Sequence, residues 1–380
     1  MIRQFSNLDD EAAVITQPDF SERLQRIIVA EAARPFQPRP LLHGTEQFAE
    51  AWLAKWHRME HGWRGRAVSC YFASDAVISG TGQIWLGDRL LTSGALMPQY
   101  VRTGLQLDRG GSEVLKGNAT LPIRPIAEPC ILLAGHGVRI YGHFLTETFL
   151  RLRVAQKALQ GSSVKCKVLL EKNSPDWLTG ILREYLGVRP NDFEFFDSSA
   201  ERVLLRKAVL PEFPRDQEFF HPLAAQIADE LREELRIREK APEAERIFVS
   251  RSLFSNPHHD QRKCSNESEL MRIAAEEYGF TPVFVETLPW PKQIALFSHA
   301  RLILGLFGSG LLNALFSSAG ARVGAIGRWN LLQSEIGTLR RQENAYLDIE
   351  VKMKYSVDEN LFRAFLAALT SDASVRVMGM

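Results

Sequence analysis

The residues with the clearest chemical potential lie in a glycine-rich turn. Gly308, Ser309 and Gly310 follow the apolar run 302–304 and precede an apolar segment that begins at Leu311. Such a turn between a strand and a helix exposes backbone N–H groups and directs the positive end of the helix dipole toward an anion. Glycine also lets the main chain approach a phosphate, because no Cβ stands in between. The turn favours a phosphate site, although many such turns only allow close helix–strand packing.

Two arginines are placed to assist this turn. Arg251 follows the apolar run 247–249, and Arg262 lies in the polar loop beyond it. Ligands bind at the carboxyl ends of strands in open α/β sheets, so we expect both side chains near the edge that carries the turn. Guanidinium groups bind phosphate oxygens through paired N–H donors. The combination predicts a diphosphate site, while each arginine taken alone is better explained as a solvated surface residue.

A second candidate site lies earlier in the chain, where His143 and Glu147 are four residues apart. This spacing places both side chains on one face of a helix. An imidazole or a carboxylate can remove the proton from a hydroxyl group during group transfer. The same pair also fits a histidine that caps a helix start and a surface glutamate, so geometry has to decide between the two interpretations.

The elements that must position these residues follow an α/β pattern, in which short apolar runs alternate with helix-period segments. In the second half we expect strands at 247–249, 283–285, 302–304 and 323–326, an edge strand at 346–351, and helices at 266–278, at 292–299 and from residue 311. Asn266 with Glu269, and Ser356 with Glu359, have the spacing of capping boxes. Gly279 is suited to end the first of these helices.

The first half predicts a similar but more elaborate unit. We expect strands at 130–134, 168–170, 193–196 and 203–210, helices from residue 141, at 177–186 and at 223–237, helix-like spacing at 21–33 and 45–59, and a hairpin at 76–86. These elements divide the chain into an N-terminal helical and β-hairpin elaboration (1–125), a Rossmann-like domain (126–222), a second Rossmann-like domain (223–350) and a C-terminal helix and tail (351–380).

A set of residues in the second half resembles glycosyltransferase family 61, strongly over residues 246–326 and more weakly upstream. The set comprises Ser250, Arg251, Arg262, Asn266, Glu267, Gln293, Ala300, Gly305, Gly308, Ser309, Gly310, Asn313 and Phe316. The family includes bacterial capsular-polysaccharide-type, plant xylan and animal O-linked N-acetylglucosaminyl transferases. The resemblance implies a GT-B fold, with two Rossmann-like domains facing a cleft. It also implies an inverting transferase that uses a nucleotide-diphosphate sugar and requires neither a metal nor another cofactor.

The resemblance also implies roles for individual residues. Gly142, His143, Phe144 and Glu147 match a family motif that faces the cleft of the acceptor domain. His143 is then the expected general base, with Glu147 orienting it or serving as the base itself. The residues expected to bind the donor are Arg251, Arg262, Asn266, Glu267, Gln293, Gly308, Ser309, Gly310 and Asn313. For Gln293, a place on a helix surface is the alternative.

Two positions depart from the family pattern. Phe307 stands where the family usually has histidine, and Ala325 stands where it usually has glutamate. Both positions are expected near the nucleotide. An altered donor, or a non-catalytic member that binds a glycan or nucleotide, is therefore the alternative interpretation.

Net charge and the absence of certain motifs argue against several other classes of protein. The 380 residues carry a net charge of +1, which gives no bulk electrostatic argument for nucleic acid. The absence of Asp-x-Asp argues against a transferase that holds the diphosphate through a divalent ion, and the order of glycines at 305–310 is not the dinucleotide-binding G-x-G-x-x-G. The four cysteines form no CxxC pair and are expected to be isolated thiols.

No segment approaches the roughly 18 consecutive apolar residues of a membrane span, and no signal-peptide pattern is visible. We therefore expect a cytoplasmic protein, and the family resemblance implies an enzyme of surface or capsular polysaccharide biosynthesis. Its partners would be a nucleotide sugar and a glycan or lipid-linked acceptor, with peripheral membrane association at the inner face.

Overall fold

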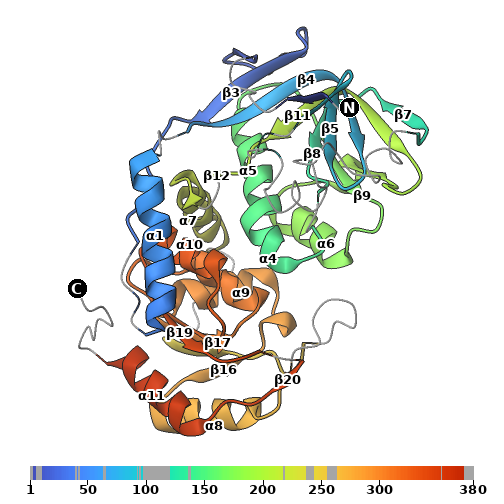
Figure 1. The fold of residues 1–380 in the computed structure, drawn as a ribbon. Helices are drawn as coiled ribbons and strands as arrows, with labels where there is room; N and C mark the ends of the chain where they lie inside the picture. The colour runs from blue at the N-terminus through green and yellow to red at the C-terminus, as the bar shows by residue number, and fades with distance from the viewer. Residues whose placement is uncertain are drawn as a thin grey trace. The chain divides into compact units, whose positions relative to one another are not determined.

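The computed structural model describes residues 3–5, 11–38, 41, 43–62, 66–91, 93, 96, 120–135, 138–216, 219–236, 244–254, 263–351 and 353–371. The chain forms two compact units (Figure 1). Unit 1 comprises Met1–Ala33 and Gly65–Leu223, and unit 2 comprises Arg34–Arg64 and Ala224–Met380.

A mixed sheet of eleven described strands forms the centre of unit 1, along the main path β1-β6-β5-β4-β11-β8-β9-β10. Its strands are β1 (Arg3–Phe5), β2 (Ala13–Val14), β3 (Leu24–Ala30), β4 (Val68–Ser79), β5 (Gln83–Leu86), β6 (Arg89–Leu91), β7 (Ile123–Ile126), β8 (Cys130–Leu132), β9 (Lys167–Glu171), β10 (Phe193–Phe196) and β11 (Arg202–Pro211). β8, β9, β10 and β11 are parallel, whereas β4 is antiparallel to β11. The N-terminal strands therefore continue the same sheet as the parallel strands.

The helical segments of unit 1 follow the parallel strands, as the sequence predicts. They are α4 (Tyr141–His143), the π-helical turn η2 (Phe144–Thr148), α5 (Phe149–Ala158), α6 (Asp176–Tyr185) and η3 (Pro190–Asp192). A small ribbon of β12 (Arg215–Asp216) and β13 (Phe219–Phe220) lies near the end of the unit's sequence. The predicted hairpin at 76–86 is confirmed, because β4 and β5 pair through Ser79 and Gln83 around a turn in which Gly80 and Gly82 have positive φ.

The helix-like spacing at 21–33 gives a wrong prediction, because this segment contains strand β3. β3 pairs antiparallel with β4, with Ile27 opposite Cys70. The consecutive β-branched residues Ile27, Ile28 and Val29 suit a pleated, half-buried surface. A short apolar run matches both periods, and here the partner strand decides the outcome.

Unit 2 is built on a five-stranded parallel sheet in the order β16-β14-β17-β18-β19 (Figure 1). Its strands are β14 (Arg246–Val249), β16 (Thr281–Val283), β17 (Leu302–Leu306), β18 (Arg322–Gly327) and β19 (Glu343–Asp348), with β15 (Lys263–Cys264) and β20 (Lys354–Tyr355) paired separately. Its helices are α1 (Glu46–Gly62), α7 (Leu223–Arg236), α8 (Glu267–Tyr278), η4 (Val285–Thr287), α9 (Trp290–His299), η5 (Ser309–Phe316), α10 (Leu331–Arg340) and α11 (Glu359–Thr370). The α/β class with parallel sheets is thus as predicted.

Most predicted strands of unit 2 are confirmed, but two local predictions need correction. The strand expected at 283–285 is β16, which ends at Val283, and residues 285–287 form the 3-10 turn η4. Pro282 suits this strand because β16 lies at an edge of the sheet. The edge strand expected at 346–351 is β19, which begins earlier, at Glu343.

Both predicted capping boxes are wrong. Asn266 precedes α8, but its side chain makes no hydrogen bond to the helix N-terminus. Its Nδ2 donates to the carbonyl oxygen of Val357, and its Oδ1 accepts from the N–H of Val357. Asp358, rather than Ser356, caps α11 by accepting a hydrogen bond from the N–H of Leu361 at 2.9 Å. The predicted end of α8 is confirmed, because Gly279 has a left-handed φ of 72°.

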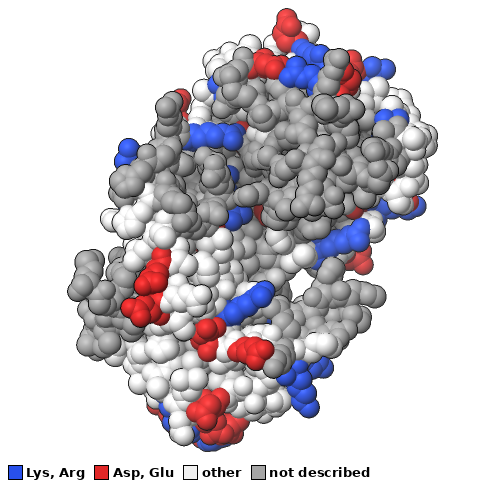
Figure 2. All heavy atoms as spheres, viewed as in Figure 1, with Lys and Arg blue, Asp and Glu red and all other residues white. Residues whose placement is uncertain are grey.

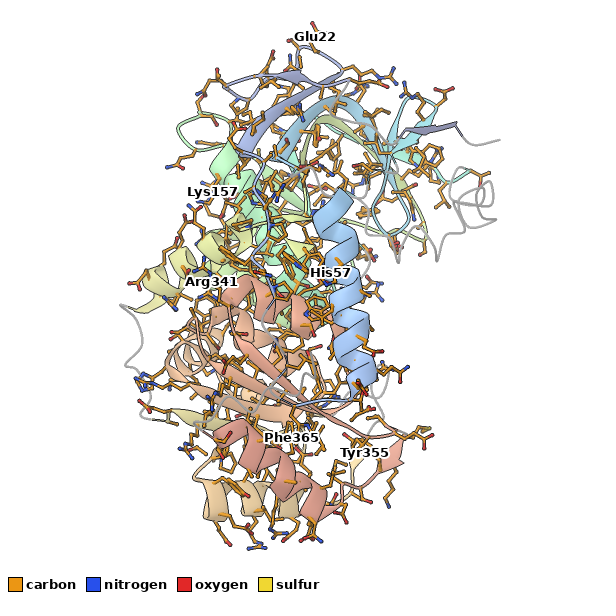
Figure 3. The ribbon with its side chains drawn as sticks, turned by 60° about the vertical axis from the view of Figure 1, so that its left-hand side comes forward. Glu22, His57, Lys157, Arg341, Tyr355 and Phe365 are labelled. Atoms are coloured by element: carbon orange, nitrogen blue, oxygen red, sulfur yellow. The ribbon has the colours of Figure 1, made fainter. Side chains whose placement is uncertain are left out.

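Helix α11 covers the sheet of unit 2 with a fully buried apolar face, as its sequence spacing predicts. Phe362, Phe365, Leu366 and Leu369 are all completely buried, and Figure 3 labels Phe365 on this helix. Helix α1, also predicted, packs on the turn after β18, where Phe48 stacks on Trp329 with ring centroids 5.9 Å apart. The buried face of α11 therefore belongs to the core of unit 2, whereas Phe48 and Trp329 are only half-buried.

We expect Gly324→Ala to destabilise unit 2 by about 1–3 kcal/mol, the usual effect of overpacking a core. A Cβ at Gly324 in β18 would lie 2.8 Å from Leu369 Cδ2 and 3.1 Å from Phe365 Cζ. The measurement is the urea midpoint. Gly180→Ala in α6 is the control, because nothing lies within 4 Å of its added Cβ and its stability should be unchanged or raised. Equal midpoints for the wild type and Gly324→Ala would contradict this packing.

The surface carries charges of both signs. Figure 2 shows Lys and Arg interspersed with Asp and Glu on the face in view, in keeping with the net charge of +1. Within the described ranges, no helix combines the length and apolar character needed to cross a membrane.

Candidate functional site

The glycine turn lies at the carboxyl end of β17, where the sequence predicts it. β17 ends at Leu306, and the 3-10 helix η5 begins at Ser309, two residues before the predicted helix start. Gly308 has φ 169° and ψ 171°, an extended conformation that any residue adopts. Glycine is needed here for space, because a Cβ at this position would lie 2.5 Å from Arg251 Nη1.

The neighbouring glycines serve packing. A Cβ at Gly305 would lie 3.0 Å from the carbonyl oxygen of Val249, and one at Gly310 would lie 2.8 Å from Val285 Cγ2. The turn is thereby held tightly against β14 and η4. Close packing therefore explains Gly305 and Gly310, whereas Gly308 makes room for a charged group.

Arg251 brings a positive charge to this turn. It follows β14, and its Nη1 donates a hydrogen bond to the carbonyl oxygen of Phe307. The guanidinium carbon also lies 5.4 Å from the centroid of the Phe254 ring. The structure thus places Arg251 beside Gly308, as the shared edge of parallel strands predicts.

Glu267 fixes the end of β14 from the first turn of α8. Its buried carboxylate accepts hydrogen bonds from the hydroxyl of Ser250 at 2.7 Å and from the main-chain N–H of Arg251 at 2.6 Å. These two hydrogen bonds offset the free-energy cost of burying the carboxylate. We infer that Glu267 positions Arg251 through its backbone.

We expect Glu267→Ala to lower the free energy of unfolding by about 1–3 kcal/mol, because two buried donors lose their acceptor. Glu267→Gln should have a much smaller effect, since its amide oxygen can still accept from Ser250 and Arg251. Urea denaturation of the two variants measures the difference. If the two variants were equally destabilised, the charge rather than the hydrogen bonds would be responsible.

A second set of predicted residues forms an internal network. Gln293 donates to the carbonyl oxygen of Leu288 at 2.9 Å, and Asn313 donates to Gln293 Oε1 at 3.1 Å and to the carbonyl oxygen of Gly310 at 3.1 Å. Both side chains are buried, so the helix-surface alternative for Gln293 is wrong. The network braces η5 against α9 immediately behind the glycine turn.

Arg262, the second predicted cation, lies outside the described residues. Asn266 lies at the start of α8, where Val357 engages both polar atoms of its side chain. Phe307 belongs to the glycine turn itself, and Ala325 is buried within β18.

Glu286 is a charged neighbour that the sequence analysis did not select. It lies in η4, the 3-10 turn that follows the edge strand β16. Partial burial of its carboxyl group raises its pKa, and Glu267 raises the pKa further while Arg251 lowers it. The residue as a whole is exposed. An acid just after a predicted strand was the available signal, but its proximity to Arg251 depends on the pairing of β16 with β14.

In unit 1, the structure brings His143 and Glu147 together. His143 Nδ1 lies 2.7 Å from Glu147 Oε1, and the side chains are 29% and 9% exposed, respectively. His143 ends α4 and Glu147 lies in the π-helical turn η2, a wider form of helix that is frequent at functional sites. This geometry does not support a separate surface glutamate.

The pair has the arrangement of an oriented base. An ionised Glu147 accepts a hydrogen bond from Nδ1–H, which leaves the lone pair of the neutral imidazole on Nε2. A carboxylate in this place also stabilises the imidazolium that forms after proton abstraction. The arrangement can therefore remove a proton from a hydroxyl group.

Metal ligands and thiols give no competing site in the described part of the chain. Among those residues, no cluster of three or more His, Cys, Asp or Glu side chains is placed to hold a metal ion. The sequence also contains two adjacent histidines, His258 and His259, which lie outside the described residues. All four cysteines are free, and burial raises the pKa of Cys166 to about 12 and that of Cys264 to about 11.

Comparison with known proteins covers both candidate sites. The family model described as Glycosyltransferase 61 matches residues 141–324, from Tyr141 to Gly324. The match includes His143, Glu147, Arg251 and the glycine turn, and Ala325 lies one residue beyond it. No curated protein matches the chain.

Proposed function

Because residues 141–324 belong to glycosyltransferase family 61 and the protein is a glycosyltransferase, we propose an inverting, metal-independent transfer. The donor is a nucleotide-diphosphate sugar, and the acceptor is a hydroxyl group of a glycan or lipid-linked molecule. The single observation that carries the proposal is the contact of Arg251 with the turn of Phe307 and Gly308.

The donor site combines main-chain amides with a cationic side chain. The N–H groups of residues 308–310 bind the diphosphate at the carboxyl end of β17, and Arg251 binds its oxygens as a charge-assisted donor. Negative charge grows on the leaving diphosphate as the sugar bond breaks. A fixed guanidinium and fixed amides stabilise this charge without reorganising at the moment of reaction. Arg251, together with Arg262, takes the role that a divalent ion has in metal-dependent transferases.

The acceptor hydroxyl is activated by His143. Nε2 removes the hydroxyl proton as the oxygen attacks the anomeric carbon, and Glu147 orients the ring through Nδ1. A single displacement of this kind inverts the anomeric configuration.

The two sites belong, in this proposal, to two Rossmann-like domains of a GT-B fold, 126–222 for the acceptor and 223–350 for the donor. Residues 1–125, apart from the segment 34–64 that belongs to unit 2, elaborate the first domain, and 351–380 supply a C-terminal helix and tail. Domain closure would bring the donor to His143 and exclude water, which limits hydrolysis. A cytoplasmic enzyme at the inner face of the membrane, acting in surface or capsular polysaccharide biosynthesis, fits this chemistry.

The test begins with thermal shift across a panel of UDP-, GDP-, ADP- and CDP-sugars, because a ligand of the folded state raises its apparent stability. The best donor is then assayed for nucleotide release with and without acceptor glycans, in EDTA and in Mg²⁺. We expect turnover in EDTA and a product of inverted anomeric configuration by NMR. Retention of configuration, or loss of turnover in EDTA, would refute the mechanism. Tight nucleotide binding without turnover would support the non-catalytic alternative raised by Phe307.

A further inference from the structure

A second arginine lies over the ring of Phe307. The guanidinium carbon of Arg328 is 5.2 Å from the centroid of this ring, a cation–π distance. Arg328 is exposed, and among the described residues no carboxylate forms an ion pair with it. Its charge is therefore held on the glycine turn without an acidic partner in that part of the chain.

The ring that carries Arg328 is fixed by two neighbouring strands. The N–H of Phe307 donates to the carbonyl oxygen of Ile326 at 2.8 Å, which ties the end of β17 to the end of β18. Gly327 has a φ of 140°, and a Cβ there would lie 3.0 Å from Phe307 Cβ. The main chain thus passes directly against Phe307, and Gly327 allows this approach. Arg328 follows at once and is placed over the ring.

The main chain of Phe307 contacts the other arginine, because Arg251 donates a hydrogen bond to the carbonyl oxygen of Phe307. Phe307 thereby contacts one guanidinium through its main chain and another through its ring. Two positive charges at one residue repel each other, and a bound anion between or beside them would offset this repulsion. Glu267 and Glu286 interact with Arg251, whereas Arg328 has no such ion pair among the described residues.

We propose that Phe307 and Arg328 form a second cationic arm of the donor site, in which the ring of Phe307 holds the guanidinium of Arg328 toward the diphosphate. This inference rests on the proposed function and specifies which further residues recognise the donor. Arginine suits the role because its planar guanidinium stacks on an aromatic face and still presents paired N–H donors to a phosphate. Phenylalanine suits it because its ring bears no charge of its own at any pH.

The inference accounts for the departure at residue 307. A histidine ring there would become cationic on protonation and would then repel Arg328, whereas the phenylalanine ring attracts it. Phe307 is then a positioning residue that acts through Arg328, and its presence is consistent with binding of a donor.

The experiment is calorimetric titration of the full chain with the nucleoside diphosphate that the wild type binds best among UDP, GDP, ADP and CDP, and with the matching nucleoside. Arg328→Gln should weaken diphosphate binding by about tenfold or more, the usual size of a lost charge-assisted bond. Phe307→Leu should weaken it by about two- to fivefold, since the side chain stays apolar but loses the ring face. Neither variant should change the affinity for the nucleoside, which a general loss of structure would lower.

Arg301→Gln is the matched control. Arg301 precedes β17 at the opposite, amino edge of the sheet, and its side chain is 79% exposed. This variant should bind the diphosphate as the wild type does. Wild-type affinity of Arg328→Gln, or an equal loss for diphosphate and nucleoside, would overturn the inference.

The same titrations separate this inference from the proposed function. If Arg251→Ala weakens diphosphate binding while Arg328→Gln does not, the donor site stands and the second arm falls. If the wild type binds none of the four diphosphates, the proposed donor chemistry fails, and the role of Arg328 fails with it.

Discussion

Replacing His143 by alanine is expected to lower kcat by about 100-fold or more while the donor affinity stays nearly constant, because general-base catalysis typically contributes factors of this size. Nδ1 of His143 is bonded to Glu147 at 2.7 Å, so the ring is already oriented before substrate binds. Steady-state kinetics with the best donor, together with calorimetric titration of the nucleoside diphosphate, measure both quantities.

The role of Glu147 is tested in the same assay. Glu147→Ala should lower kcat less than His143→Ala, and the double variant should be little worse than His143→Ala alone, since the two residues act as one unit. His299→Ala is the control, because His299 is an exposed histidine at the end of α9. Unchanged kcat in His143→Ala would remove this residue from the mechanism, and Glu147→Ala as the more damaging change would make the carboxylate the base.

The parallel sheet of unit 2 was predictable because its strands are short, continuous apolar runs separated by helix-period segments. Once β14 and β17 are recognised as parallel strands, their carboxyl ends must lie at one edge. That rule alone places Arg251 and Gly308 at the same edge of the sheet, whereas their contact needed side-chain positions. The four-residue spacing placed His143 and Glu147 on one helical face, although it did not indicate the π-helical turn that contains Glu147.

Local signals failed where a distant segment supplied the stronger partner. Asn266 has the right spacing to cap α8, yet Val357, which is 91 residues further along the chain, takes both of its polar atoms. β3 likewise carries helix-like spacing, and its pairing with β4 overrides that spacing. In both cases the competing interaction is tertiary, so a window of neighbouring residues contains no trace of it.

The reason for Gly308 also required side-chain positions. Sequence reasoning attributes a glycine in such a turn to a bound phosphate or to close helix–strand packing, and the observed φ of 169° shows that the backbone conformation of Gly308 does not require glycine. The Arg251 guanidinium occupies the space that a Cβ would take. The pairing of Phe307 with Arg328 is of the same kind, because it arises from the ends of two neighbouring strands.

Replacing Arg251 by alanine is expected to weaken nucleoside diphosphate binding by about 10- to 100-fold, as for other charge-assisted hydrogen bonds. Arg251→Lys should recover part of the affinity, because it keeps the charge but loses the planar donor pair. Calorimetric titration measures the affinities. Urea denaturation checks that losing the hydrogen bond to Phe307 has not destabilised the fold.

Gly308→Ala tests the same contact from the other side. Its Cβ would lie 2.5 Å from Arg251 Nη1 and 3.0 Å from Cζ, so the guanidinium must move away from the turn. We expect a loss of diphosphate affinity comparable to that of Arg251→Ala. The double variant should bind the diphosphate no more weakly than the single variant with the lower affinity, since both changes break one arrangement. Full additivity would mean that Gly308 and Arg251 contact the diphosphate independently. Wild-type affinity in both single variants would place the diphosphate elsewhere on the protein.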